Sequence, residues 1–181
     1  LLCGHIDEVG MMIQYIDDNG FLYISSIGGF EPIILPAQRV VIHNANGPVK
    51  GVIGHRPPHF ADKSEDPKIK FHTIFVDIGA SSKENAKHLV SVGDPITFDS
   101  SYTSLANNRV SARGLDDRIG AWVVARGLED LNKRGYVKVP VCSVATIQEE
   151  NGLYGSRMVS NYIKPSVGIA VDLTHATDVP N

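Results

Sequence analysis

The pattern of hydrophobic and turn-forming residues changes near Asn107, and this change constrains the fold more than any other feature of the sequence. Before it, short runs of strand-forming residues are separated by turn residues. After it, apolar runs alternate with stretches of helical periodicity. Short strands linked by tight turns are typical of small barrels and sandwiches, whereas alternating strands and helices are typical of a parallel sheet covered by helices. The sequence therefore predicts a β-rich barrel or sandwich before Asn107 and a parallel sheet covered by helices after it.

Two hairpins are predicted in the first part of the chain. Each joins two short apolar runs through an Asn-Gly dipeptide, which accepts the positive φ angles of a tight turn. The dipeptides are Asn19-Gly20 and Asn46-Gly47. The four runs are 11–16, 21–24, 39–43 and 49–53. Strands at this spacing, with little helix, indicate a small β-barrel or sandwich.

Residues 72–78 and 94–98 add two further strands to this region, with one short helix between them. We expect the helix to start at Ser81, whose hydroxyl can cap it while Glu84 reaches back to the backbone of the cap. This β-rich region extends over residues 10–106.

The second part of the chain predicts helix, strand, helix and strand. Its first helix follows from an apolar stripe and ends at Lys133-Arg134-Gly135, where cations and a C-cap glycine are favourable. The stripe consists of Ile119, Trp122, Val123, Leu128 and Leu131. Apolar runs at 139–147 and 166–173 predict buried strands, and residues 152–163 predict the second helix.

Residues 1–4 have the same apolar character, and we expect them to join the same sheet. The predicted fold is an α/β domain with a mostly parallel sheet flanked by helices, made of residues 1–9 and 107–181. A small β-barrel-like domain, residues 10–106, is inserted into it. The chain starts directly in a strand-like run and ends soon after another, so we expect both ends to be cuts through a larger domain.

Composition argues against several classes of partner. A formal net charge of -3 leaves no basic surface for a nucleic acid. No apolar stretch approaches the ~18 residues that span a bilayer, so we expect no membrane segment. Cys3 and Cys142 lie in apolar runs, where unpaired thiols usually pack as small hydrophobic side chains, and we expect a reducing, cytoplasmic environment.

Polar clusters follow the predicted strands at one edge of the sheet. In sheets of this type, ligands gather at the carboxyl ends of the strands. The clusters are His5-Ile6-Asp7, Gln148-Glu149-Glu150, Asp172 with Thr174-His175, and Asp116-Asp117-Arg118 at the start of the first helix. We expect these four segments to meet at one rim.

One histidine among several carboxylates is a ligand set for zinc, cobalt or manganese. Two such ions are commonly bridged by a shared carboxylate. Asp7 shares a face of the extended segment with His5 and can hold its imidazole in the metal-binding tautomer. Glu149 and Glu150 point apart, so one can bind metal while the other acts as general base for a metal-bound water.

Each cluster also has a purely structural interpretation. The cluster at His5 could be a capped turn, that at Asp116 a helix cap, and that at Glu149 solvated turn charge. Asp172 is less easily explained in this way, because a carboxylate that ends an apolar strand is desolvated unless it has a partner. The coincidence of all four clusters favours a metal site.

Four motifs resemble those of the glutamyl-aminopeptidase and tetrahedral-aminopeptidase family of dinuclear metallopeptidases, in order and through nearly the whole chain. They are Gly4-His5-Ile6-Asp7-Glu8-Val9-Gly10, Gly114-Leu115-Asp116-Asp117-Arg118-Ile119-Gly120, Gln148-Glu149-Glu150-Asn151-Gly152-Leu153 and Val171-Asp172-Leu173-Thr174-His175-Ala176. Pro57-Pro58-His59 and Asp77-Ile78-Gly79-Ala80 also resemble parts of the inserted domain of that family.

The resemblance implies a role for each site residue. Four residues would hold two divalent ions, zinc by preference, with cobalt and manganese as alternatives. The ligands would be His5 and Asp172 on one ion, Glu150 on the other, and Asp116 bridging both. Glu149 would be the general base, and Asp7 would orient the imidazole. The family supplies a further histidine for the second ion, and His175 is the one residue after Asp172 that could replace it.

The resemblance further implies a metal-dependent aminopeptidase that hydrolyses N-terminal residues from peptides through a metal-bridged water. It also implies a homo-oligomer assembled through the inserted domain. Three alternatives stay open. The chain could be a non-catalytic assembly module or an inactive fragment of such an enzyme, or it could be a related sugar-chain hydrolase, which two carboxylates alone would permit. His5 and Asp116 favour metals over the sugar-chain hydrolase.

Overall fold

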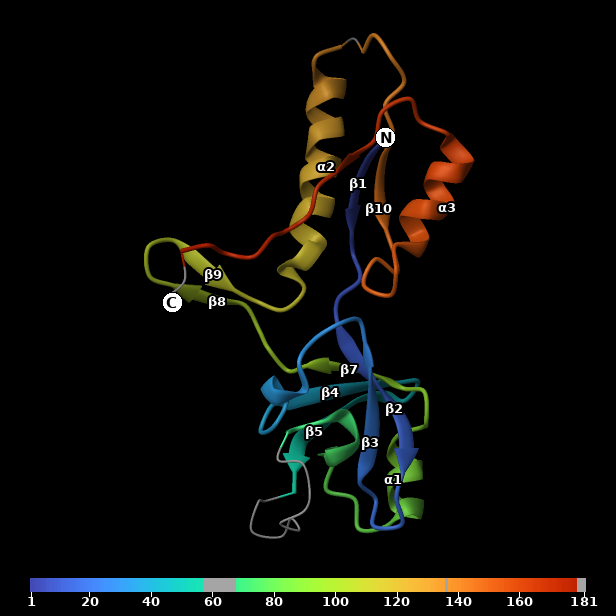
Figure 1. The fold of residues 1–181 in the computed structure, drawn as a ribbon, viewed down its shortest axis with the longest axis vertical. Helices are drawn as coiled ribbons and strands as arrows, with labels where there is room; N and C mark the ends of the chain where they lie inside the picture. The colour runs from blue at the N-terminus through green and yellow to red at the C-terminus, as the bar shows by residue number, and fades with distance from the viewer. Residues whose placement is uncertain (57–67, 136, 179–181) are drawn as a thin grey trace. The chain divides into compact units, whose positions relative to one another are not determined.

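The computed structural model describes residues 1–56, 68–135 and 137–178, so the motif Pro57-Pro58-His59 lies outside the described residues. The chain divides into two compact units. One consists of Leu1–Glu8 with Tyr102–Asn181, and the other is Val9–Ser101. A short hairpin, β8 (Thr103–Leu105) with β9 (Arg109–Ser111), belongs to the first of these units (Figure 1).

Unit Val9–Ser101 is a closed six-stranded barrel. Neighbouring strands follow the order β2-β3-β6-β5-β4-β7, and every neighbouring pair is antiparallel. The strands are β2 (Gly10–Ile16), β3 (Leu22–Ile27), β4 (Arg39–Asn44), β5 (Gly47–His55), β6 (Ile74–Asp77) and β7 (Pro95–Phe98). The predicted small barrel is therefore confirmed, and closure leaves these strands no open edge.

Both predicted Asn-Gly hairpins are present in the barrel. Gly20 and Gly47 have φ angles of 91° and 117°, which side-chain-bearing residues rarely adopt. Alternate residues of the strands point inward and form one apolar core. Its largest fully buried side chains are Met11, Ile13, Leu22, Leu35, Ile42, Ile53, Ile74 and Ile96. The turn chemistry and the alternation together fix which face of each strand is buried.

The short helices of the barrel differ slightly from expectation. Helix α1 spans Lys83–Leu89 and is capped by Ser82, whose hydroxyl accepts the N–H of Asn85, so the prediction of Ser81 as the cap is wrong by one residue. The Ser81 N–H instead donates to the side-chain oxygen of Asn85. Single 3-10 turns, η1 (Pro32–Ile34) and η3 (Phe71–Thr73), lie in the connections.

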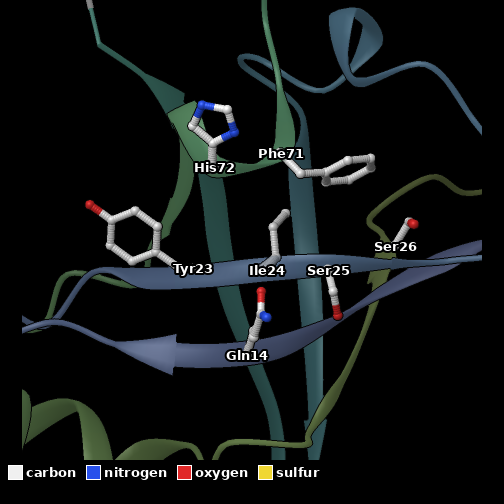
Figure 2. A pocket seen from close by; sticks show the side chains of 7 residues that line it. All are labelled: Gln14, Tyr23, Ile24, Ser25, Ser26, Phe71 and His72. Atoms are coloured by element: carbon white, nitrogen blue, oxygen red, sulfur yellow. The ribbon is translucent and has the colours of Figure 1, made fainter.

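A pocket of about 360 Å³ opens on the barrel (Figure 2). It is lined by Gln14, Tyr23, Ile24, Ser25, Ser26, Phe71 and His72. This lining contains no carboxylate and none of the residues that the sequence predicts as metal ligands. The residues that the sequence predicts as metal ligands all belong to the other unit.

Unit Leu1–Glu8 with Tyr102–Asn181 contains a three-stranded sheet in the order β10-β1-β11. Strand β1 (Leu2–His5) lies in the middle and pairs in parallel with β10 (Ser143–Thr146) and β11 (Ile169–Ala170). A parallel sheet is thus confirmed for these three strands. Because all three run in the same direction, their carboxyl ends lie at one rim.

The strands of this sheet are shorter than the apolar runs that predict them. The runs at 139–147 and 166–173 become four-residue and two-residue strands. Strand β10 pairs residue for residue with the four residues of β1, from Leu2 opposite Ser143 to His5 opposite Thr146. Strand β11 pairs with only Leu2 and Cys3 of β1, so both ladders are shorter than the apolar runs.

Helix α2 (Leu115–Lys133) packs against β1 and β10, and helix α3 (Tyr154–Ile163) follows β10 (Figure 1). The face of α2 on the sheet carries Asp117, Gly120 and Val124, which are buried. The apolar stripe that predicts the helix lies mostly elsewhere, since Trp122 is 62% exposed. No helix in the described ranges combines the length and hydrophobicity needed to cross a bilayer.

Small residues allow the close approach of α2 to β1. A Cβ atom added to Gly4 would lie 2.5 Å from the carbonyl carbon of Gly120 and 2.8 Å from the Cα atom of Ala121. Backbone cannot yield at such distances without moving the helix. The start of α2, which carries Asp116 and Asp117, is therefore positioned by the absence of a side chain at Gly4.

We expect Gly4→Ala to lower the free energy of unfolding by about 1–3 kcal/mol, because the added methyl group overpacks the contact between strand and helix. Gly168→Ala is the matched control, since a Cβ atom there meets nothing within 4 Å. Urea unfolding of both variants measures the difference. Equal midpoints for the two variants would contradict this account of helix packing.

Candidate metal centre

His5 is the centre of the candidate site. It ends β1, its side chain is only 3% exposed, and its backbone N–H donates to Asp117 Oδ2 at 3.1 Å. Its Nδ1 atom lies 3.1 Å from the carbonyl oxygen of Asp7. Because a carbonyl oxygen can only accept, this contact places the proton of a neutral imidazole on Nδ1 and leaves Nε2 free to bind a cation.

Three carboxylates surround the Nε2 atom of His5. Asp116 Oδ1 lies at 3.2 Å, and Glu149 Oε2 and Asp172 Oδ1 each lie at 3.8 Å. They come from the start of α2, from the segment after β10 and from the segment after β11. The structure therefore brings together the four clusters that the sequence places at the rim.

The candidate ligands form two groups that share His5. One is His5 with Asp116 and Glu150, and the other is His5 with Asp117 and Asp172. Within each group the ligand atoms all lie within 4.8 Å of one another. Among the described residues, neither group includes His175, which is exposed.

The crowding of negative charge changes the proton affinity of the site. Burial lowers the pKa of His5, but Asp172, Asp7 and Glu149 raise it more, so the net shift is upward. Burial raises the pKa of Glu150, and the neighbouring charges of Asp116 and Glu149 raise it further. The neighbouring carboxylates contribute to both shifts, and a divalent cation would balance their negative charge.

Asp7 holds two segments of the rim together. Its carboxylate accepts the backbone N–H groups of Glu149 and Glu150 at 3.1 and 3.2 Å, and one carboxylate oxygen lies 3.5 Å from Nδ1 of His5. The sequence predicts only the contact with the imidazole. The two amide contacts were missed because they join residues 142 and 143 positions apart in the chain.

Asp117 belongs to the candidate site, although sequence reasoning did not single it out as a site residue. It is fully buried, and its carboxylate accepts the N–H groups of His5 and of Gly120, the latter at 3.0 Å. Asp116 and Asp117 have non-helical backbone angles, so regular helix begins after them and Asp117 caps it in the manner of an N-cap aspartate. The signal in the sequence is an acidic residue three positions before Gly120.

Comparison with known proteins gives a consistent family. Residues 1–181 match the model of the family described as M42 glutamyl aminopeptidase. A lysyl aminopeptidase of Pyrococcus furiosus is 36% identical over 179 residues, covering 97% of this chain and 51% of the relative. Several such relatives match over similar shares, so the chain spans about half the length of the curated relatives it matches.

Solved structures agree with this match. A TET aminopeptidase from a Thaumarchaeota archaeon of marine sediment is similar with a TM-score of 0.91 and 35% identity, over 99% of this chain and 52% of that chain. The TET1 peptidase of Pyrococcus horikoshii, which can assemble into a tetrahedron or a large octahedral shell, is similar with a TM-score of 0.80 and 31% identity, over 99% of this chain and 56% of that chain.

We expect Asp117→Ala to lower the free energy of unfolding of the metal-free protein by about 2–4 kcal/mol, because two buried N–H groups lose their acceptor. Asp117→Asn retains one acceptor oxygen and should lose less. Urea unfolding in the presence of a chelator measures both variants without a contribution from bound metal. If Asp117→Ala left the metal-free stability unchanged but abolished zinc binding, Asp117 would be a ligand and not an anchor.

Proposed function

Since the chain belongs to the M42 glutamyl aminopeptidase family, we propose that it supplies most of the active site of a metal-dependent aminopeptidase. The observation that carries the proposal is one buried imidazole with three carboxylates within 3.8 Å of Nε2. Such a set of nitrogen and oxygen ligands suits zinc, with cobalt and manganese as alternatives. The substrates are peptides, from which N-terminal residues are removed.

Four residues would hold two divalent ions. His5 and Asp172 would bind one, Glu150 would bind the other, and Asp116 would bridge them. Asp116 and Glu150 share one group of candidate ligands with His5, and Asp172 shares the second group, which supports this division. Asp117 is less suited to bind an ion, because both of its oxygens already accept backbone N–H groups. Bound divalent ions would polarise the scissile carbonyl and lower the pKa of water.

Glu149 is the general base in this proposal. It lies beside the ligands, with Oε2 at 3.8 Å from His5 Nε2, and it belongs to neither group of candidate ligands. Its side chain is partly exposed, so water can reach it. Glu149 would take a proton from the attacking water and deliver it to the amine that leaves the peptide.

Asp7 acts as a positioning residue. Its carboxylate fixes the backbone of Glu149 and Glu150, and its carbonyl oxygen fixes Nδ1 of His5. One residue therefore sets the direction of a ligand, of the base and of the imidazole. Small displacements of such groups cost activity steeply, because proton transfer requires hydrogen-bond distances.

Two single substitutions separate the base from the ligand. We expect Glu149→Gln to retain its divalent ions and to lower kcat about 10²–10⁴-fold, the usual contribution of a general base. Glu150→Gln is the matched control with the same chemical change one residue away, and it should lose one divalent ion. The measurement combines a peptidase assay with elemental analysis of metal after dialysis.

Retained hydrolysis in Glu149→Gln with its metal bound would remove Glu149 from the mechanism. A protein that holds no divalent ion after dialysis would instead favour the non-catalytic assembly module, in which the carboxylates are structural. Metal content and hydrolysis thus distinguish the two interpretations of the same cluster.

The barrel of Val9–Ser101 would join copies of the chain. Support comes from the TET1 peptidase of Pyrococcus horikoshii, which can assemble into a tetrahedron or a large octahedral shell, and from apolar side chains on the surface of the barrel. Ile33 and Ile34 in η1 are 70% and 51% exposed, which is costly unless another surface covers them. These two side chains would lie in the contact between copies.

We expect the double substitution Ile33→Asp with Ile34→Asp to reduce the oligomer to smaller species, because charge buried at an apolar contact is unfavourable. Gln38→Asp, an exposed polar position of the same unit, is the control and should leave the mass unchanged. Light scattering coupled to size exclusion measures the mass. An unchanged mass in the double variant would place the contact elsewhere.

A further inference from the structure

We propose that Glu8 is a positioning residue for the metal centre, an inference that rests on the proposed function. Glu8 directly follows His5-Ile6-Asp7 and is the last residue of its unit before the barrel unit Val9–Ser101 in the sequence. Its side chain is 15% exposed and accepts hydrogen bonds from two arginines that enclose Asp116 in the sequence, Arg113 and Arg118. In this proposal Glu8 itself binds neither the metal nor the substrate.

Glu8 forms a bidentate ion pair with Arg113 and a further hydrogen bond with Arg118. Arg113 donates from Nε to Oε2 at 3.1 Å and from Nη2 to Oε1 at 2.8 Å, which is a bidentate pair. Arg118 donates from Nη2 to Oε1 at 3.0 Å. Bidentate pairs between arginine and carboxylate fix orientation as well as distance, and partial burial reduces their screening by solvent.

These contacts restrain both ends of the segment that presents Asp116. The segment departs from helical geometry, since Gly114 has a φ angle of 68° and Asp116 has φ and ψ angles of −82° and 111°. Helical hydrogen bonds therefore do not define its path as they do in the rest of α2. Glu8 holds Arg113 before Asp116 and Arg118 after it, so the carboxylate of Asp116 stays 3.2 Å from Nε2 of His5.

Gly114 is part of the same arrangement. The guanidinium of Arg118 lies over it, because a Cβ atom at Gly114 would come 2.5 Å from Nη1 and 2.8 Å from Cζ of Arg118. The absence of a side chain thus lets Arg118 reach Glu8 across the turn that precedes Asp116. The turn and the ion pairs form one unit.

Charge gives Glu8 a second effect on the site. Without Glu8, the guanidinium of Arg118 could pair with another carboxylate, and Asp116 is two residues away in the sequence. An arginine paired with Asp116 would compete with a divalent ion for the same oxygens. Glu8 therefore both places Asp116 and keeps two cations away from its carboxylate.

The test is the zinc affinity of Glu8→Gln, measured by competition with a chromophoric chelator. We expect the affinity to fall about 10–100-fold, as is usual when a residue that orients a metal ligand is changed. The absorption spectrum of the protein loaded with Co²⁺ should change as well, because it reports ligand geometry. A role limited to fold stability would leave that spectrum unaltered.

Glu129→Gln is the matched control. Glu129 also pairs with an arginine, Arg126, but it lies near the C-terminal end of α2, whereas Asp116 lies at the start of that helix. Its substitution should leave zinc affinity and the Co²⁺ spectrum unchanged. Arg113→Lys is the second variant. This variant keeps the positive charge but cannot form the bidentate pair with Glu8. It should therefore weaken zinc binding, as Glu8→Gln does.

Circular dichroism of the metal-free proteins shows whether each variant is folded. If Glu8→Gln does not fold, the zinc affinity of Arg113→Lys tests the proposal instead. A folded variant with wild-type zinc affinity and an unaltered Co²⁺ spectrum would overturn the role of Glu8 alone. A wild-type protein that binds no zinc would overturn the proposed function and this inference with it.

Discussion

Carboxylates crowded around one buried imidazole repel each other, and the site can persist only where positive charge or N–H groups balance them. The structure meets this constraint in two ways. The carboxylates of Asp7 and Asp117 accept backbone N–H groups, which hold them in place as anchors. Asp116 and Asp172 face Nε2 of His5 instead, and their charge stays available for a bound cation. The division between anchors and candidate ligands follows from this difference in partners.

The candidate ligands could be predicted because they depend on a local rule. Polar residues that follow parallel strands reach one rim whatever the rest of the sheet contains, and His5, Glu150 and Asp172 obey this rule. Asp117 and Glu8 could not be assigned in this way. The contact of Asp117 with His5 and those of Glu8 with Arg113 and Arg118 join residues 105 to 112 positions apart in the chain, so these roles appear only when the strands and α2 are packed.

The fold shows the same limit of local signals. Asn46-Gly47 determines a hairpin by its own backbone preference, and the hairpin is present where the sequence predicts it. Strand length depends on pairing partners, so apolar runs overestimated β10 and β11. The capping of α1 by Ser82 instead of Ser81 depends on which hydroxyl reaches Asn85, a choice of one residue that the composition of the segment does not decide.

The position of β1 has a consequence for how the molecule forms. The barrel strands lie between residues 10 and 98. Strand β1, by contrast, pairs with β10, which begins only at Ser143. Contacts of such high sequence separation form late, because the entropy of closing the intervening loop is lost before any pairing is gained. During synthesis the barrel can therefore complete its hydrogen bonds first. Strand β1 precedes the barrel in the sequence but pairs with β10 only after the barrel strands have been made.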